Sequence, residues 1–268
     1  MDVIVDPRAP QRLRHETRMR LLKVIAIADL TPSMRRITLA GDLTGFAAPG
    51  HADHIKAFFF PPGVEPKLVP IGPRGAEFAE GERPEMRDYT PRQYDLDAGT
   101  LDLDFVLHGD GPASSWAAQA SIGQTLVIGG PRGSLIVPAA FDWYLLAGDE
   151  TAIPALARRI AELPEGAPVI AVIEVDNPAE HQPLPGSADV RLIHVYRNGA
   201  PAGSTSLILD RLRVTSFPEG TGYAYVAGEA SMSKAVRAHL TGERGFAPDY
   251  VKAAGYWRLG TPDAQEDH

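Results

Sequence analysis

The pattern of apolar residues changes near residue 140, and this change constrains the fold more than any other feature of the sequence. Before it, short runs alternate apolar and polar residues, as in residues 101–107 (LDLDFVL), and turn residues separate them. Several such runs predict an antiparallel β-barrel or sandwich. After it, continuous apolar runs such as residues 169–175 (VIAVIEV) alternate with helical segments, which is typical of a parallel α/β sheet.

We therefore expect a β-barrel plus α/β fold. A Greek-key antiparallel barrel would span residues 15–140, and a Rossmann-like parallel-sheet domain would span residues 141–268. Residues 1–15 read as a polar arm, residues 61–86 as a turn-rich excursion, and residues 231–240 as a helix with a serine available as its N-cap. This pairing of domains suggests a flavin on the barrel and a pyridine nucleotide on the α/β half.

Composition excludes several classes of function. The 268 residues include no cysteine, which excludes disulfides, thiolate zinc sites, iron–sulfur clusters and a cysteine nucleophile. The formal net charge of −8 argues against nonspecific nucleic-acid binding. We expect no membrane span and no secretory signal. We also expect no metal site, and we interpret His51 and His54 as ordinary polar residues rather than metal ligands.

Residues 87–92 (RDYTPR) carry groups that suit a flavin dinucleotide. An aromatic ring can stack, a hydroxyl can donate a hydrogen bond, and arginines can pair with phosphates. On a strand, Arg87 and Tyr89 would share one face, and Asp88 and Thr90 the other. A solvated edge strand with ordinary charges is the competing interpretation.

Two other segments combine a glycine turn with a helix start, where free N–H groups can meet a phosphate: residues 108–117 (HGDGPASSWA) and 145–154 (LLAGDETAIP). The carboxylates of Asp149 and Glu150 would disfavour a phosphate beside them. A phosphate at the second segment would therefore be bound by backbone groups. Plain connections between strand and helix remain the alternative for both. Residues 129–134 (GGPRGS) indicate a tight turn in which Arg132 could point into a cleft. Residues 253–260 (AAGYWRLG) could cover a cofactor or dock as a terminal strand.

Taken together, these segments resemble the siderophore-interacting protein family of flavin-dependent ferric-siderophore reductases. The matching segments run in the family's order: RDYTPR, DFVLHGDGPASSWA, GPRGS, LAGDETAIP, Gly228-Glu229 and GYWRLG. They cover roughly residues 18–260.

The resemblance implies site residues. For FAD they are Arg87, Tyr89, Thr90, Arg92, His108, Gly111, Ala113, Ser114 and Trp116. For the pyridine nucleotide they are Gly148, Asp149, Glu150, Thr151, Gly228 and Glu229. For the anionic chelate they are Lys56, Arg132 and Arg258. Arg191 and Arg197 are candidates for contact with a nucleotide 2′-phosphate.

The implied reaction takes electrons from NADPH or NADH, or from ferredoxin, through FAD to Fe(III) held by a siderophore, in the cytoplasm. The flavin carries the chemistry, so no general acid, general base or protein nucleophile is expected. Two alternatives stay open. One is a reductase that moves electrons between NADPH and a ferredoxin-like protein. The other is a flavin-containing siderophore-binding module without turnover.

Overall fold

The computed structural model describes residues 6–61, 63–72, 75–109 and 111–261. Asp110, within the second glycine segment, lies outside the described residues. The chain divides into two compact units. One contains residues 11–136, and the other contains residues from 137 onward with the described residues before Gln11. Each unit is described by itself.

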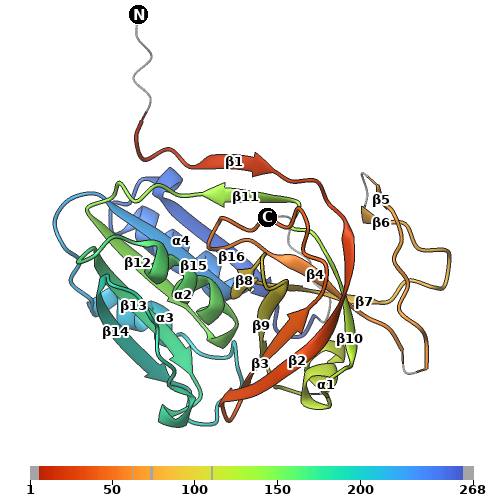
Figure 1. Cartoon of the computed structure of the whole chain (residues 1–268). Coiled ribbons are helices and arrows are strands. Elements are labelled where there is room, and N and C mark those ends of the chain that lie inside the picture. Colours follow the sequence, from red (N-terminus) through yellow and green to blue (C-terminus); the bar gives the residue numbers. More distant parts are fainter. Residues whose placement is uncertain (1–5, 62, 73–74, 110, 262–268) are drawn as a thin grey trace, which may run out of the picture. The chain divides into compact units, whose positions relative to one another are not determined.

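The first unit is built almost entirely of antiparallel strands (Figure 1). They are β1 (Gln11–Arg14), β2 (Met19–Thr31), β3 (Met34–Ala40), β4 (Ile55–Phe59), β5 (Ile71–Gly72), β6 (Gly75–Ala76), β7 (Glu85–Tyr89), β8 (Gln93–Asp95), β9 (Thr100–Val106), β10 (Thr125–Gly129) and β11 (Gly133–Ile136). One short helix, α1 (Pro112–Ala118), follows β9.

Seven of these strands form one sheet in the order β7-β4-β10-β2-β3-β9-β8. The last of them in sequence, β10, inserts between β2 and β4, which is a Greek-key connection. The two edge strands, β7 and β8, are joined by residues 90–92 alone. Such a short link holds the ends of the two edges within about 14 Å of each other. The sheet is therefore curled, and the predicted Greek-key barrel is confirmed.

Alternation along the strands fills the inside of the curl, as the sequence pattern predicts. Leu101, Leu103 and Phe105 are fully buried in one core. The opposite face of β9 carries Asp102 and Asp104, and the polar positions of the alternating pattern predict a solvated exterior there, which is wrong for Asp104. The Asp104 side chain is 1% exposed and accepts two hydrogen bonds from the Arg36 guanidinium on β3, at 2.7 and 2.8 Å. A paired carboxylate can be buried there because the cross-strand arginine supplies its donors.

The excursion between β4 and β7 has its own small core. It contains the short hairpin β5–β6, and its apolar residues pack on the outer side of the sheet against Phe58 and Val127. The aromatic ring of Phe78 lies 5.8 Å from that of Phe58. The excursion is therefore anchored to the barrel by apolar contacts rather than being a purely polar loop.

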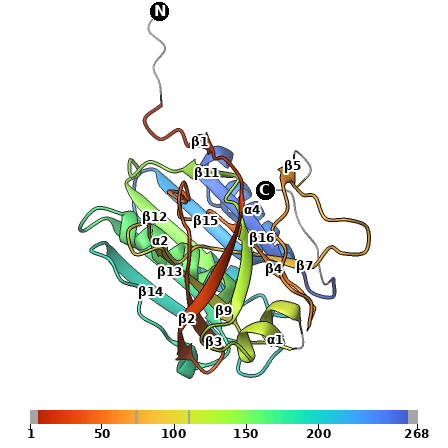
Figure 2. The ribbon, with the colours of Figure 1, turned by 45° about the vertical axis from the view of Figure 1, so that its right-hand side comes forward.

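The second unit is a sheet of five parallel strands in the order β14-β13-β12-β15-β16 (Figure 2). The strands are β12 (Trp143–Gly148), β13 (Pro168–Val175), β14 (Asp189–Tyr196), β15 (Gly222–Glu229) and β16 (Val251–Trp257). The helices are α2 (Ile153–Glu162), α3 (Leu207–Val214) and α4 (Ala230–Gly242), with short 3₁₀ turns η1 (Glu150–Ala152), η2 (Pro178–Glu180) and η3 (Pro248–Tyr250). The predicted Rossmann-like sheet is confirmed.

Strand order reverses between β12 and β15, so the crevice beyond their carboxyl ends is the place where such sheets bind ligands. Helices α3 and α4 cover one face through Ile208, Leu212, Val236 and Leu240. Helix α2 packs on β12 and β13, and right-handed crossovers place it on the other face. Within the described part of the chain, no helix is long and apolar enough to cross a membrane.

The start of α4 differs from expectation. Its N-cap is Glu229, whose carboxylate accepts a hydrogen bond from the Met232 backbone N–H at 2.9 Å. The predicted serine cap at Ser231 is wrong because the helix begins one residue earlier, at Ala230. The acidic cap satisfies a backbone donor that would otherwise lack an intrahelical partner.

The connection between β13 and β14 lies within the described residues and contains a 3₁₀ turn and no α-helix. Three stacked rings, those of His181, His194 and Tyr196, cover β14 there. The His181 ring lies 3.8 Å from the His194 ring, and its Nε2 lies 2.8 Å from the Tyr196 hydroxyl. Burial, and to a lesser degree the neighbouring His181, lower the pKa of His194. The folded protein therefore favours neutral His194.

We expect this stack to make stability depend on pH. Below the ordinary histidine pKa of about 6.5, the unfolded chain takes up a proton that folded His194 resists. Stability should thus fall as pH drops from that value through the lowered folded pKa. Urea unfolding at pH 7.5 and 5.5 should show a smaller drop for His194→Phe than for the wild type. An equal drop in both proteins would contradict the prediction.

Candidate functional site

The RDYTPR segment lies where the two edges of the curled sheet meet. Arg87 and Tyr89 end β7 opposite Ala57 and Ile55 of β4, so their side chains share the core-facing side. Thr90 is buried, and the Arg92 N–H donates to the Asp102 carbonyl at 2.9 Å. The RDYTPR segment therefore has two roles: it closes the sheet, and it presents aromatic and cationic side chains.

Tyr89 is part of an aromatic surface. Its ring lies 4.4 Å from that of Phe105, which lies 5.6 Å from the ring of Trp116 on α1. Burial raises the pKa of Tyr89, and Arg87 opposes this shift, so the phenol stays protonated at neutral pH. A half-buried ring held by two others is a rigid platform on which a planar group can stack.

The turn before α1 is open and its helix start is uncapped. The Ser114 hydroxyl accepts a hydrogen bond from the His108 backbone N–H at 2.8 Å, which ties the turn to the helix. No side chain caps the helix, which begins at Pro112 after Gly111. A β-carbon on Gly109 or Gly111 would meet no described atom within 4 Å.

These features fit FAD. The platform suits a flavin ring, Arg87 suits a phosphate, and backbone N–H groups at an uncapped helix start suit a pyrophosphate. The fit depends on the chemistry of the donors and on the open turn, both in the same unit.

Of the three basic residues expected at the chelate site, two lie in the first unit. The Lys56 Nζ is 2.8 Å from the Asp88 carboxylate, across the β4–β7 pair. The Lys56–Asp88 pair lies on the opposite face of the sheet from Tyr89, because Asp88 and Tyr89 are neighbours on one strand and their side chains point to opposite faces. Arg132 is exposed in the turn between β10 and β11, and Arg258 is exposed after β16 in the other unit.

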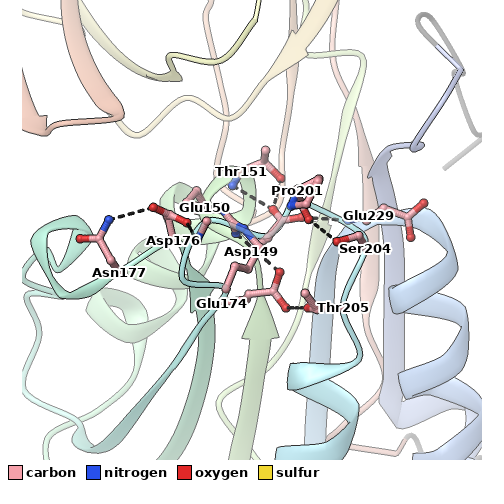
Figure 3. A network of polar contacts seen from close by, with 12 residues as sticks. Asp149, Glu150, Thr151, Glu174, Asp176, Asn177, Pro201, Ser204, Thr205 and Glu229 are labelled. Carbon is pink, nitrogen blue, oxygen red and sulfur yellow. Dashed lines mark hydrogen bonds and ion pairs between the residues drawn. The ribbon is translucent and has the colours of Figure 1, made fainter.

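In the second unit, Asp149 occupies the crevice between β12 and β15 (Figure 3). Its Oδ1 accepts hydrogen bonds from the Thr151 N–H at 2.9 Å and hydroxyl at 2.5 Å. Its Oδ2 accepts from the Glu229 N–H at 3.0 Å and the Trp257 indole at 2.9 Å. Burial raises the pKa of Asp149, and the hydrogen bonds from Thr151 and Trp257 oppose that shift.

Two more buried carboxylates lie beside Asp149 and share one arginine. Arg197 donates to both Glu150 oxygens, at 2.9 and 2.5 Å, and lies 3.5 Å from Glu174. Burial raises the pKa of Glu174, against a hydrogen bond from Thr205. Arg197 is thus held in an internal ion pair, and Arg191 lies near the amino end of β14, away from the edge where ligands bind.

The two glycines of this site permit close packing. A β-carbon on Gly148 would collide with the Ala227 carbonyl oxygen and lie 2.5 Å from the Ala152 β-carbon. A β-carbon on Gly228, which has a φ of +135°, would lie 2.5 Å from the Asp149 carboxylate. These glycines therefore let β12, β15 and the Asp149 turn approach one another.

We expect Gly148→Ala to lower the free energy of unfolding by about 3 kcal/mol, because overpacking a tight contact forces the backbone apart. Gly242→Ala is the matched control, since a β-carbon at that helical position would meet no described atom within 4 Å apart from its chain neighbours and its own helix backbone. It should leave stability unchanged or raise it by up to about 1 kcal/mol. Chemical denaturation of both variants tests this, and equal effects would contradict it.

Sequence reasoning missed several residues that shape these sites. Phe105 lies beneath Tyr89, whereas the alternation of residues 101–107 predicts for it only an inward-facing core position. Nothing in the sequence signalled that Trp257 donates to Asp149, or that Arg197 pairs with Glu150, because both contacts join segments far apart in the chain.

Comparison with known protein families gives two matches that together cover most of the chain. Residues 23–135 match the family described as siderophore-interacting FAD-binding domain. Residues 141–260 match the family described as siderophore-interacting protein.

Curated relatives and solved structures agree with these matches. The chain is 35% identical over 260 residues to the NADPH-dependent ferric-chelate reductase of Escherichia coli, covering 94% of this chain and 97% of that protein. It is 32% identical to the ferric vibriobactin reductase ViuB of Vibrio cholerae, covering 90% of each. A siderophore utilization protein from T. fusca superposes with a TM-score of 0.89 at 37% identity, covering 96% of this chain and 98% of that one. A ferredoxin reductase in carbazole 1,9a-dioxygenase shares the fold, with a TM-score of 0.65 at 17% identity, covering 89% and 67%.

Proposed function

The chain belongs to the siderophore-interacting protein family, and on that premise we propose that it is a flavin-dependent reductase of ferric siderophores. The observation that carries the proposal is the RDYTPR segment at the closure of the sheet. There, an aromatic platform, a buried hydroxyl and two arginines lie within a unit that matches the family's FAD-binding domain.

FAD is the cofactor of this domain. In our proposal, Tyr89 stacks on the flavin, Thr90 donates a hydrogen bond, and Arg87 and Arg92 pair with phosphate oxygens. His108, Gly111, Ala113 and Ser114 support the pyrophosphate, and Trp116 backs the platform. The chemistry that bound FAD would supply is the coupling of a two-electron oxidation of the donor to one-electron reductions of Fe(III).

The substrate is an anionic ferric siderophore. In our proposal, Lys56 and Arg132 of the first unit attract and orient it, and Arg258 supplies positive charge on the second unit. Local positive charge can do this although the chain carries a net charge of −8. Hard oxygen donors bind Fe(III) much more tightly than Fe(II), so one-electron reduction releases the metal. The reduction of the iron requires no general base and no protein nucleophile.

We propose NADPH as the electron donor, as the name of the Escherichia coli relative supports. It would lie against the second domain, residues 141–268, along Gly148–Thr151 and Gly228-Glu229. The carboxylates of Asp149 and Glu150 are engaged in internal hydrogen bonds. The nucleotide would therefore be held by backbone groups and by hydrogen bonds from its own ribose or amide donors. NADH and reduced ferredoxin are the alternative donors. We place the reaction in the cytoplasm, where NADPH is regenerated.

The test is anaerobic absorbance of the purified, FAD-loaded protein. NADPH, then NADH, then reduced ferredoxin would be added to separate samples, followed by a ferric triscatecholate siderophore and a chromogenic Fe(II) chelator. We expect NADPH to bleach the flavin absorbance. The siderophore should restore it, with two Fe(II) formed for each NADPH oxidised.

Other results identify the competing functions. Bleaching by reduced ferredoxin alone keeps the iron chemistry and changes the donor. Bleaching by NADPH followed by electron transfer to ferredoxin, but not to the chelate, indicates an electron-transfer reductase. A flavin that no donor bleaches, in a protein that still binds the chelate, indicates a binding module.

A further inference from the structure

A chain of side-chain hydrogen bonds links three segments of the first unit. The Ser134 hydroxyl on β11 donates to the Asp53 carboxylate at 2.5 Å, and the His15 Nε2 lies 2.6 Å from the same hydroxyl oxygen. Because Ser134 gives its only proton to Asp53, His15 must donate from Nε2. Ser134 and Asp53 are buried, at 6% and 4% exposure, so these bonds are shielded from water.

The linked residues flank two cations of the proposed chelate site. Ser134 comes two residues after Arg132, and Asp53 comes three residues before Lys56. The His15 backbone N–H also donates to the Arg132 carbonyl at 3.0 Å. His15 therefore contacts this part of the chain twice: its backbone bonds to Arg132 in the turn, and its ring bonds to Ser134 at the start of β11.

The β4–β10 ladder pairs Lys56 with Gly129 and ends three residues before Arg132, so the backbone ties only the start of the Arg132 turn to β4. At the other end of the turn, β11 pairs with β1 and not with β4 in the described sheets. The side-chain link is supported by close packing, because a β-carbon on Gly50 would lie 2.6 Å from the Asp53 carboxylate and 2.8 Å from the Leu135 carbonyl. The Asp53 carboxylate also accepts from the Gly50 N–H at 2.8 Å.

We propose that His15 is a positioning residue for ferric-chelate binding: through Ser134 and Asp53 it holds the Arg132 turn in place relative to the segment that leads to Lys56. The inference rests on the proposed function. An exposed arginine on a turn contributes to binding only if its backbone is fixed, since a side chain on a loose turn must be ordered when the ligand binds.

The test measures chelate binding directly. The probe is the gallium(III) complex of a triscatecholate siderophore, which has the charge and shape of the ferric complex and takes no electron. Calorimetry gives its Kd for the FAD-loaded wild type and for the variants His15→Ala, His15→Gln, Ser134→Ala and Arg14→Ala. Arg14 is the matched control because it is an exposed cation on β1, next to His15.

We expect His15→Ala and Ser134→Ala each to raise the Kd about fivefold, the size of one lost hydrogen bond. His15→Gln, whose amide nitrogen can replace Nε2 as donor, should restore the wild-type Kd to within about twofold. Arg14→Ala should change little. In the ferric assay, KM should follow the Kd while kcat and the rate of flavin reduction by NADPH stay the same.

A double-mutant cycle separates positioning from general support of the barrel. If His15 acts through Arg132, then His15→Ala added to Arg132→Ala should cause no further loss of affinity. A wild-type Kd in both His15→Ala and Ser134→Ala, or an undiminished fivefold loss in the Arg132→Ala background, would overturn the inference. A wild type that neither binds the gallium complex nor reduces the ferric one would overturn the proposed function itself.

Discussion

Replacing Lys56 and Arg132 together by alanine should raise the KM for a ferric triscatecholate about 100-fold while FAD content and flavin reduction by NADPH stay unchanged. Unit charges about 4 Å apart interact by about 1 kcal/mol even in water, and the chelate carries more than one charge. A loss of about 1.4 kcal/mol for each contact corresponds to about tenfold in affinity. Steady-state Fe(II) formation at several chelate concentrations measures this change.

The double variant needs a control for net charge, because it also removes two positive charges from an acidic protein. Lys23→Ala with Lys67→Ala makes the same charge change at exposed positions of the same unit. This control should shift the KM less than about twofold, since exposed charges are screened by salt. Equal KM values in the two double variants would remove Lys56 and Arg132 from the substrate site.

Replacing Asp149 by asparagine should destabilise the second unit about as much as replacing it by alanine, by about 3 to 5 kcal/mol. The carboxylate accepts four hydrogen bonds, two on each oxygen. An asparagine has one acceptor oxygen, and its NH₂ group would face N–H or O–H donors. Buried donors left without an acceptor cost about 1 to 3 kcal/mol each.

Urea denaturation, followed by tryptophan fluorescence, measures this loss. The matched control is Asp249→Asn, the same chemical change at an exposed position near β16, which should alter the free energy of unfolding by less than about 0.5 kcal/mol. An Asp149→Asn protein as stable as the control would contradict the role assigned to Asp149.

Much of the fold could be predicted from the period of the apolar residues alone. The alternation in residues 101–107 predicts a half-buried strand, and β9 occupies Thr100–Val106 with Leu101, Leu103 and Phe105 inside. The continuous apolar runs after residue 140 predict buried parallel strands, and β12 and β15 are buried along their whole lengths. These predictions succeed because burial on one or both faces dictates the pattern directly.

Short elements were harder to predict. Strand β1 (Gln11–Arg14) is exposed at every position, so the sequence reads as a polar arm. Helix α3 was not predicted, although Ile208 and Leu212 are four residues apart and both are buried. That spacing is a helical signal, but the segment has only eight residues and follows a loop rich in glycine and serine, so the signal is short.

The candidate sites depend on contacts that sequence spacing cannot provide. Strand alternation separates Arg87 and Tyr89 from Asp88, and the structure has this arrangement. Alternation within one strand cannot reveal that Lys56 lies across from Asp88 on the other face, because that requires the register between β4 and β7. The same holds for Trp257 and Asp149, which are 108 positions apart.

The link from β7 to β8 has a consequence for how this protein can change over time. Residues 90–92 carry part of the proposed flavin contact and are also the only covalent path between the two edges of the sheet. A substitution in this link would remove only the contact that the replaced side chain makes. An inserted residue would instead let the edges of the sheet separate and would displace Tyr89 from Phe105. Natural variants of this segment should therefore differ in residue type and agree in length.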